Sequence, residues 1–306
     1  MQVHFDMPRP RLGPTALTIG SFDGVHPGHA AVIGMVVRAA RSTGLGSALL
    51  TFEPHPRCVV DPANCPKSLT TLEEKVRLFE AIGIDHLIVI QFTAALSGLP
   101  AAGFMAGLLE GVDLRHLVIG PDFALGHRRA GDGTWLRAHG AEHGYRVEVA
   151  DLVRHEGVDL HSSEIRRLVT LGDMPAARKL LGRDYSIEGL VQPGDRVGRR
   201  LGFPTANIAV PPNKLVPALG AYAGRVRTET GEFAGALSVG YRPTFGGTEL
   251  RVEAFLLDYE GDLYQRRIEL SFLLHLHDDL KFDSWEALSA RIAEDVERTR
   301  QLAGPS

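Results

Sequence analysis

Cysteine is scarce in this chain of 306 residues, since Cys58 and Cys65 are the only two. They lie between prolines and lack the Cys-x-x-Cys spacing of common zinc and redox sites. Disulfide frameworks are typical of small secreted domains that are much richer in cysteine. We therefore expect no disulfide, no cysteine-based zinc site and a reducing, cytoplasmic setting.

Long apolar runs are also missing. None approaches the roughly 18 residues that indicate a membrane span, and segment 1–11 contains no apolar core of an export signal. We expect a protein that is neither exported nor embedded in a membrane, and that has no membrane partner.

Positive charge is not in excess, because 33 Lys and Arg residues stand against 37 Asp and Glu residues, for a formal net charge of -4. No global basic field is available to gather nucleic acid. We expect no nucleic-acid partner, and any polyanion must be bound locally. The sequence contains no internal repeat between its halves and no low-complexity segment. It gives no expectation of the oligomeric state.

The composition that is present is that of a folded globular protein, with 44% hydrophobic and 23% charged residues. The length indicates about two domains. Glycine is abundant, because 34 of the 306 residues are glycine, a share above the usual value of about 7%. Several of these glycines cluster in the segments that carry the chemistry described below.

The first half of the chain, to about residue 150, alternates short apolar runs with longer amphipathic stretches. This pattern predicts strands joined by helices, in a parallel sheet with helices on both faces. Thr71 and Glu74 have the spacing of a capping box, which predicts a helix start. The predicted strands are 16–20, 47–52, 86–92, 117–120 and 146–149; the predicted helices are 30–40, 72–81, 101–109 and 134–143, with two more from about Glu164 and after Asp173.

The second half, beyond a boundary near 182–185, has apolar runs separated by Gly- and Pro-rich turns. Strands without crossover helices predict an antiparallel barrel or sandwich. A terminal helix is predicted from Trp285, with Asp283 or Ser284 as N-cap and an apolar face of Trp285, Leu288, Ile292 and Val296. The predicted strands are 185–191, 221–227, 233–239, 250–257 and 267–273.

The first predicted strand runs into Gly20-Ser21-Phe22-Asp23-Gly24-Val25-His26-Pro27-Gly28-His29 and then into a helix. The segment therefore lies at the carboxyl edge of the sheet, where open α/β sheets bind ligands. Its glycines let backbone approach a bulky anion, and the helix start supplies N–H groups. We predict a phosphate site in which His26 and His29 stabilise negative charge. Two alternatives stay open: the histidines cap the helix, or they bind a metal with His55 or His127.

This segment resembles the His-x-Gly-His signature of the nucleotidyltransferase superfamily, in the form seen in bacterial bifunctional riboflavin kinase/FMN adenylyltransferases. Segments 51–56, 119–126 and 161–166 follow in the order of that family, and the last resembles a stretch whose hydroxyls and arginine hold the ATP phosphates. The resemblance implies that Asp122 and Phe123 contact the flavin. It also implies nucleotide contacts from Gly20, Phe22, Asp23, Gly24, Gly28, Ser162, Ser163 and Arg166.

A second glycine-rich segment, 194–207, carries three arginines but no Gly-Lys-Ser/Thr, so it is not a P-loop. Without further evidence, this segment fits a flexible surface turn as well as it fits a phosphate-binding loop. Its end, 202–207, closely resembles the flavokinase motif Gly-Phe-Pro-Thr-Ala-Asn. That resemblance implies that Gly202, Thr205 and Asn207 bind ATP phosphates, and that Thr205 and Asn207 also organise Mg²⁺.

Phosphoryl transfer to an alcohol also needs a group that takes the hydroxyl proton. Glu253, in the apolar run 250–257, matches the catalytic glutamate of the flavokinase family, although alone it would suit a solvated strand edge. The segment 239–245 fits the family as well, which implies that Arg242 contacts the flavin.

The resemblance spans roughly residues 16 to 300. It implies a Rossmann-like α/β nucleotidyltransferase domain, residues 1–183, followed by an antiparallel β-barrel flavokinase domain with a C-terminal helix, residues 184–306. The implied reactions are phosphorylation of riboflavin to FMN by ATP with Mg²⁺, and adenylylation of FMN to FAD with release of pyrophosphate.

Three departures from the family pattern are Pro121, Ala124 and Ser163. Ser163 keeps a hydroxyl, but Ala124 removes a cation from a loop that lies near the flavin nucleotide in the family. Two alternatives therefore stay open. One is a flavin kinase with a weakened or redirected adenylyl step, and the other is a non-catalytic flavin- or nucleotide-binding protein.

Overall fold

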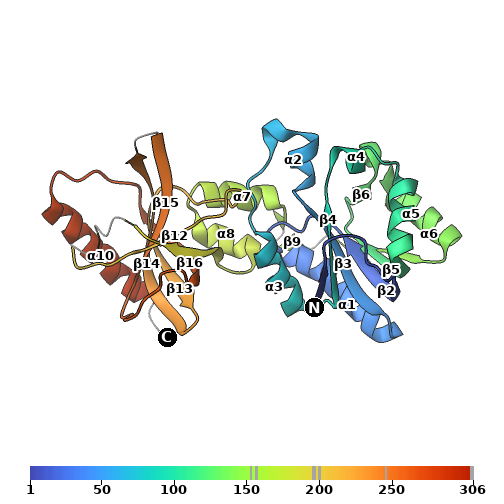
Figure 1. Ribbon diagram of the computed structural model, residues 1–306, viewed down its shortest axis with the longest axis horizontal. Helices are drawn as coiled ribbons and strands as arrows, with labels where there is room; N and C mark the ends of the chain where they lie inside the picture. Colours follow the sequence, from blue (N-terminus) through green and yellow to red (C-terminus); the bar gives the residue numbers. More distant parts are fainter. Residues whose placement is uncertain (152–153, 156–157, 195–197, 199–200, 245–246, 304–306) are drawn as a thin grey trace. The chain divides into compact units, whose positions relative to one another are not determined.

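A computed structural model describes residues 1–151, 154–155, 158–194, 198, 201–244 and 247–303. The chain divides into two compact units, Met1–Leu160 and His161–Ser306 (Figure 1). The predicted domain boundary between residues 183 and 184 stays a prediction.

The first unit is built on a six-stranded sheet in the order β1-β4-β3-β2-β5-β8, and every neighbouring pair is parallel. The predicted parallel sheet is confirmed, and β1 is an edge strand that the sequence pattern missed. The strands are β1 (Gln2–His4), β2 (Leu12–Ile19), β3 (Gly46–Glu53), β4 (His86–Gln91), β5 (Val112–Ile119) and β8 (Arg146–Val149).

Helices cover both faces of this sheet (Figure 1). Successive residues of a strand point to opposite faces, so neighbouring strand residues pack against different helices. Leu49 packs with Val36 and Phe79 on the side of α1 and α3, whereas Leu50 packs with Met105 and Leu136 on the side of α5 and α6. The elements are α1 (Pro27–Thr43), α2 (Pro56–Val60), η1 (Pro62–Asn64), α3 (Leu72–Ile82), α4 (Ala94–Ser97), α5 (Ala101–Gly111), β6 (Ala124–Leu125), η2 (His127–Arg129), β7 (Gly131–Asp132), α6 (Gly133–His143), β9 (Arg154–His155) and β10 (Val158–Asp159).

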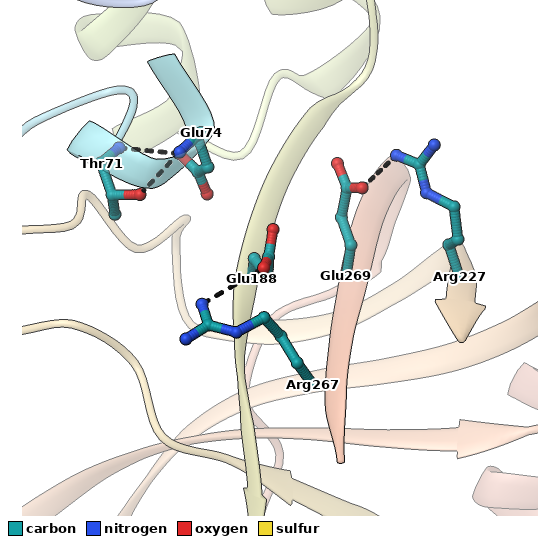
Figure 2. Close-up of polar contacts among 6 residues, drawn as sticks. All are labelled: Thr71, Glu74, Glu188, Arg227, Arg267 and Glu269. Carbon is teal, nitrogen blue, oxygen red and sulfur yellow. Dashed lines mark hydrogen bonds and ion pairs between the residues drawn. The ribbon is translucent and has the colours of Figure 1, made fainter. Parts of the chain in front are cut away.

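The start of α3 is fixed by the predicted capping box (Figure 2). The backbone N–H of Thr71 donates to Oε2 of Glu74 at 2.8 Å, and the backbone N–H of Glu74 donates to Oγ1 of Thr71 at 3.2 Å. Each side chain thus satisfies an amide that the helix itself leaves without a partner.

The cysteines contradict our expectation. The structure joins Cys58, in α2, to Cys65, which follows η1, in a disulfide. Two short helical turns fold the chain back and bring their Cα atoms to 4.2 Å, which sequence spacing does not reveal. The expected absence of a disulfide is therefore wrong, while the cytoplasmic setting stays a prediction. None of the helices in the described part of the chain is long and apolar enough to cross a bilayer.

The second unit contains a closed six-stranded barrel in the order β11-β12-β15-β14-β13-β16, with antiparallel pairing between neighbours. The predicted barrel is confirmed. Strand β12 was missed because three residues are too few to show an alternating pattern. The strands are β11 (Tyr185–Gln192), β12 (Ala206–Ile208), β13 (Gly220–Thr228), β14 (Gly231–Thr244), β15 (Gly247–Leu256) and β16 (Arg267–His277).

Aromatic rings fill part of the barrel interior. Tyr222 meets Phe272 edge to face with ring centroids 5.2 Å apart, and Tyr185 lies opposite Phe272 in the register of β11 and β16. Between strands, Glu269 pairs with Arg227 directly across from it, and Arg267 pairs with the buried Glu188 at 3.2 Å (Figure 2). These two ion pairs offset the like charges of Glu188 and Glu269, which lie directly opposite each other in the pairing of β11 with β16.

In the described part of the chain, the barrel is accompanied by α7 (Ser162–Thr170), α8 (Met174–Leu181) and α10 (Trp285–Ala303). The predicted cap at Asp173 is confirmed, since Ala176 N–H donates to its Oδ1 at 3.1 Å. Ser284 rather than Asp283 caps α10, through Ala287 N–H at 3.1 Å. Trp285 does not join the buried face as expected, because it is the first helical residue, beyond the barrel wall, and 61% exposed.

A glycine in β13 gives a stability test. A Cβ on Gly224 would lie 2.4 Å from both Leu237 Cδ1 and the Ser271 carbonyl oxygen, whereas one on Gly240 in β14 would meet nothing within 4 Å. We expect Gly224→Ala to lower the free energy of unfolding by about 1–3 kcal/mol, as for overpacked cores. Gly240→Ala should change it by less than about 1 kcal/mol. Chemical denaturation of both variants measures the difference, and equal effects would contradict the tight approach.

Candidate functional site

The loop after β2 turns sharply at the carboxyl edge of the sheet. Gly20 N–H donates to the Leu50 carbonyl at 3.0 Å, which holds the loop beside β3. Phe22, Gly24 and Val25 then adopt positive φ angles of 45°, 86° and 42°. Side chains of Phe and Val rarely tolerate this region, and such backbone gathers at functional sites.

His26 and His29 lie together at the start of α1. His26 is the N-cap, and its Nδ1 accepts from His29 N–H at 3.4 Å, so the capping alternative is realised for this residue. The rings stack with centroids 3.7 Å apart and planes 21° from parallel. Stacked rings do not aim their lone pairs at one point, which disfavours joint metal chelation. Gly28 permits the arrangement, because a Cβ there would lie 3.1 Å from the His26 ring.

His29 is held as a neutral ring. Burial lowers its pKa well below the usual value, His26 and Lys75 lower it further, and Asp23 raises it. Its Nδ1 is buried and has no hydrogen-bond partner among the described residues. Phe22 meets the ring edge to face at 5.3 Å. A neutral imidazole in this position can donate one N–H to a phosphate oxygen without carrying a charge.

Asp23 is used inside the loop rather than at its surface. It is 2% exposed, and its two oxygens accept the backbone N–H groups of Leu69 and Thr70, both at 3.0 Å. The Thr70 hydroxyl lies 3.2 Å from Asp23 Oδ1 and accepts from Gly24 N–H at 2.9 Å. Asp23 therefore ties the loop to the segment before α3, and its predicted nucleotide contact stays a prediction.

Thr70 and Lys75 are two residues of this region that the sequence reasoning missed. Lys75 lies on α3 and is 4% exposed, and its charge lowers the pKa of His29. Burial raises the pKa of Glu53, and the charge of Lys75 opposes that rise. The available signal was its position one turn before Phe79 on the apolar face of the helix.

The loop after β5 carries the predicted flavin contacts. Asp122 is exposed, and its carbonyl accepts from the Arg129 guanidinium, while Phe123 packs partly against the α5 side of the core. Ala124 begins β6 and supplies no charge. The roles of Asp122 and Phe123 stay predictions.

The predicted phosphate clamp lies on α7. Ser162 and Ser163 form its first turn and Arg166 lies one turn further on. This helix falls in the second compact unit, so its cooperation with His26 and His29 stays a prediction.

In the second unit, strand pairing brings Thr205, Asn207 and Glu253 together. Asn207 lies directly opposite Glu253 in the pairing of β12 with β15, so the two side chains share a face. The Thr205 hydroxyl donates to Oε2 of Glu253 at 3.1 Å. Arg251 donates to Oδ1 of Asn207 at 3.4 Å. The side-chain oxygens of Thr205 and Asn207 thus lie in one cluster with the carboxylate of Glu253, although Thr205 and Glu253 are 48 residues apart in the sequence.

Close backbone packing surrounds this cluster. A Cβ on Gly194 would lie 2.2 Å from the Asn207 amide nitrogen, and one on Gly198 would lie 2.2 Å from the Phe203 carbonyl. Gly202 has a φ of 86°, which suits the turn before β12. Residues 195–197 and 199–200 and the Arg242 side chain lie outside the described part of the structure.

A cavity of about 420 Å³ opens beside Glu253 and Thr205. Its walls are mostly apolar, and this volume is in the range of small-molecule sites. A second hollow of about 110 Å³ lies on another side of Thr205, against Tyr259 and Tyr264. The apolar lining of the larger cavity comes from Phe203, Leu237, Phe255, Phe282, Leu288 and Ile292.

An open parallel sheet with a glycine- and histidine-bearing loop, joined to a barrel with a hydroxyl–carboxylate cluster, defines a two-domain phosphate-transfer enzyme. The FAD synthetase family profile matches residues 9–164, and the riboflavin kinase profile matches residues 181–303. The chain belongs to the bifunctional riboflavin kinase/FMN adenylyltransferase family.

Relatives with that description match nearly the full length of the chain. The protein from Pseudomonas fluorescens is 36% identical, over 97% of this chain and 96% of its own. The protein from Listeria monocytogenes is 35% identical, over 93% and 91%. A solved structure titled as a macrolide-efflux protein from Streptococcus pneumoniae has a TM-score of 0.87 and 26% identity, over 98% of this chain and 99% of its own.

The lowered pKa of His29 gives a pH-dependent prediction. Below the unfolded value of about 6.5, the unfolded chain takes up a proton at this position that the folded protein does not. The free energy of unfolding of the wild type should therefore fall, relative to His29→Asn, as the pH drops below about 6.5. Urea denaturation of both proteins across this range measures the difference, and parallel pH profiles would contradict a neutral His29.

Proposed function

We propose that this protein phosphorylates riboflavin with ATP to give FMN, and then transfers AMP from a second ATP to FMN, with FAD and pyrophosphate as products. The observation that carries the proposal is that the two family matches fall on the two regions in which His26 lies with His29 and Glu253 lies with Thr205 and Asn207. The kinase step is assigned to the barrel and the adenylyl step to the α/β unit.

In the kinase step, Glu253 accepts the proton of the ribityl hydroxyl as that oxygen bonds to the γ-phosphorus and ADP leaves. The Thr205 hydroxyl, 3.1 Å from Oε2, orients the carboxylate for this task. The apolar cavity beside Glu253 holds the flavin ring and excludes water. This division of labour needs no covalent intermediate on the protein.

Mg²⁺ is proposed as the ion that accompanies ATP in the barrel. The Thr205 hydroxyl and the Asn207 amide oxygen would hold it, and hard oxygen donors are the ligands that Mg²⁺ prefers. When bound, the ion neutralises charge on the phosphates.

In the adenylyl step, a phosphate oxygen of FMN attacks the α-phosphorus of ATP and pyrophosphate leaves. His26 and His29, with the amides at the start of α1, stabilise the charge that builds on the α-phosphate oxygens. Ser162, Ser163 and Arg166 are proposed to grip the triphosphate, with a guanidinium fork that suits phosphate. Asp122 and Phe123 are proposed to contact the flavin in this step, and Arg242 of the barrel is proposed to contact it in the kinase step.

A kinase with a redirected adenylyl step is the second candidate. It is favoured by Ala124, which brings no cation to the loop after β5. Supplying FMN with ATP separates the two candidates. FAD as product supports the bifunctional enzyme, whereas FMN formation from riboflavin without any FAD from FMN selects the alternative. Riboflavin binding in calorimetry without either product would select a non-catalytic binding protein.

The kinase assignment is tested by Glu253→Gln. We expect FMN formation from riboflavin to fall by about 10²-fold or more, since the proton acceptor is lost. FAD formation from supplied FMN should be unchanged. The matched control is Glu232→Gln, an exposed position on β14. Chromatography of the flavin products measures both reactions, and full kinase activity in Glu253→Gln would refute its role.

The adenylyl assignment is tested by His29→Asn. We expect FAD formation from FMN to fall by about 10²-fold, as when one donor to a developing charge is removed. FMN formation from riboflavin should persist. Loss of both products from this single change would argue against two separate sites.

A further inference from the structure

One wall of the large cavity lies outside the barrel. After β16 ends at His277, the segment 278–284 passes along the cavity, to which Leu280 and Phe282 contribute, and leads into α10. Helix α10 packs against β13 and β14, and its Leu288 and Ile292 complete the wall. The position of this wall therefore sets the width of the cavity.

A partly buried polar contact joins the wall to the barrel. His277 Nε2 lies 2.9 Å from Oδ2 of Asp295 on α10, and Asp295 is 8% exposed. Arg291 Nε lies 3.4 Å from the other carboxylate oxygen. Because residues 277 and 295 flank the segment and the first half of α10, their contact closes the covering stretch into a loop.

The backbone of β13 is shaped to place His277. The pairing of β13 with β16 shifts register between Ala221 and Tyr222, where Ala221 faces His277. Such irregularities re-aim side chains near binding sites. Gly220, with a φ of 142°, lets this end of β16 come close, since a Cβ there would lie 2.2 Å from the His277 carbonyl.

The imidazole of His277 lies between two oxygen atoms. Nδ1 of His277 lies 2.7 Å from the Asp278 carbonyl oxygen, which can only accept a hydrogen bond. Nε2 lies 2.9 Å from Oδ2 of Asp295, so the ring links the end of β16 to α10 through both of its nitrogens.

We propose that His277 and Asp295 are a positioning pair that holds α10 and the segment 278–284 over the cavity, and so sets the affinity for riboflavin. The pair does not touch the reacting atoms; it acts through Leu288, Ile292 and Phe282. This inference rests on the proposed kinase function of the barrel.

Two variants of Asp295 test the pair. Asp295→Ala removes it, and we expect KM for riboflavin to rise by about tenfold or more, as for a lost hydrogen bond to a charged group, with kcat nearly unchanged. Asp295→Asn can donate its amide N–H to an unprotonated Nε2, so it should restore a KM close to that of the wild type. Glu294→Ala is the control, because Glu294 is exposed and also pairs with Arg291.

The split between KM and kcat, together with the Asp295→Asn variant, separates positioning from general loss of structure, because a loss of structure would lower kcat in both variants. A KM that does not respond to Asp295→Ala, or a KM that Asp295→Asn does not restore, would overturn the inference.

Hydrogen exchange distinguishes failure of this inference from failure of the proposed function. In Asp295→Ala, the amides of residues 278–294 should exchange faster than in the wild type, whatever reaction the protein catalyses. If the wild type makes no FMN but exchange accelerates in Asp295→Ala, the positioning pair is supported and the kinase assignment fails. If the wild type makes FMN and exchange is unchanged in Asp295→Ala, the positioning pair is refuted.

Discussion

The proposed chemistry depends on two loops, and in each loop a carboxylate accepts a hydrogen bond from a threonine hydroxyl. Asp23 accepts two backbone amides and the Thr70 hydroxyl, and so fixes a loop that contains three positive φ angles. Glu253 accepts a hydrogen bond from the hydroxyl of Thr205, the residue before β12. The two carboxylates differ in their surroundings: Asp23 is buried and accepts backbone N–H groups, whereas Glu253 borders a cavity. The first carboxylate shapes the backbone of its loop, and the second is the proposed proton acceptor.

Periodicity and local chemistry of the sequence predicted most of the architecture. All strands of the parallel sheet except β1, and all strands of the barrel except β12, were found because buried runs and turn residues are local signals. The capping box at Thr71 and Glu74 and the cap at Asp173 were found because their partners lie three residues apart. Resemblance to known motifs supplied the candidate residues, and the structure brings Thr205, Asn207 and Glu253 together as that resemblance implies.

The remaining features depend on contacts between distant residues. Asp23 and Thr70 are 47 residues apart, and nothing in either segment predicts their hydrogen bond. The same is true of His277 and Asp295, since one lies at the end of β16 and the other lies on the terminal helix. The disulfide between Cys58 and Cys65 was missed because two short turns, rather than a recognised spacing, bring the residues together. Trp285 was assigned to the buried face because helical periodicity does not show where the barrel ends.

The ends of the parallel sheet bear on how the protein avoids self-association. A closed barrel presents no unpaired strand, whereas an open sheet presents two. Here those two are β1 and β8, of three and four residues, the shortest strands in the sheet. So few unpaired backbone groups give an incoming chain little to extend. The large hydrophobic sheet is thus bordered by poor templates for fibril growth, and crowding should not drive its edges together.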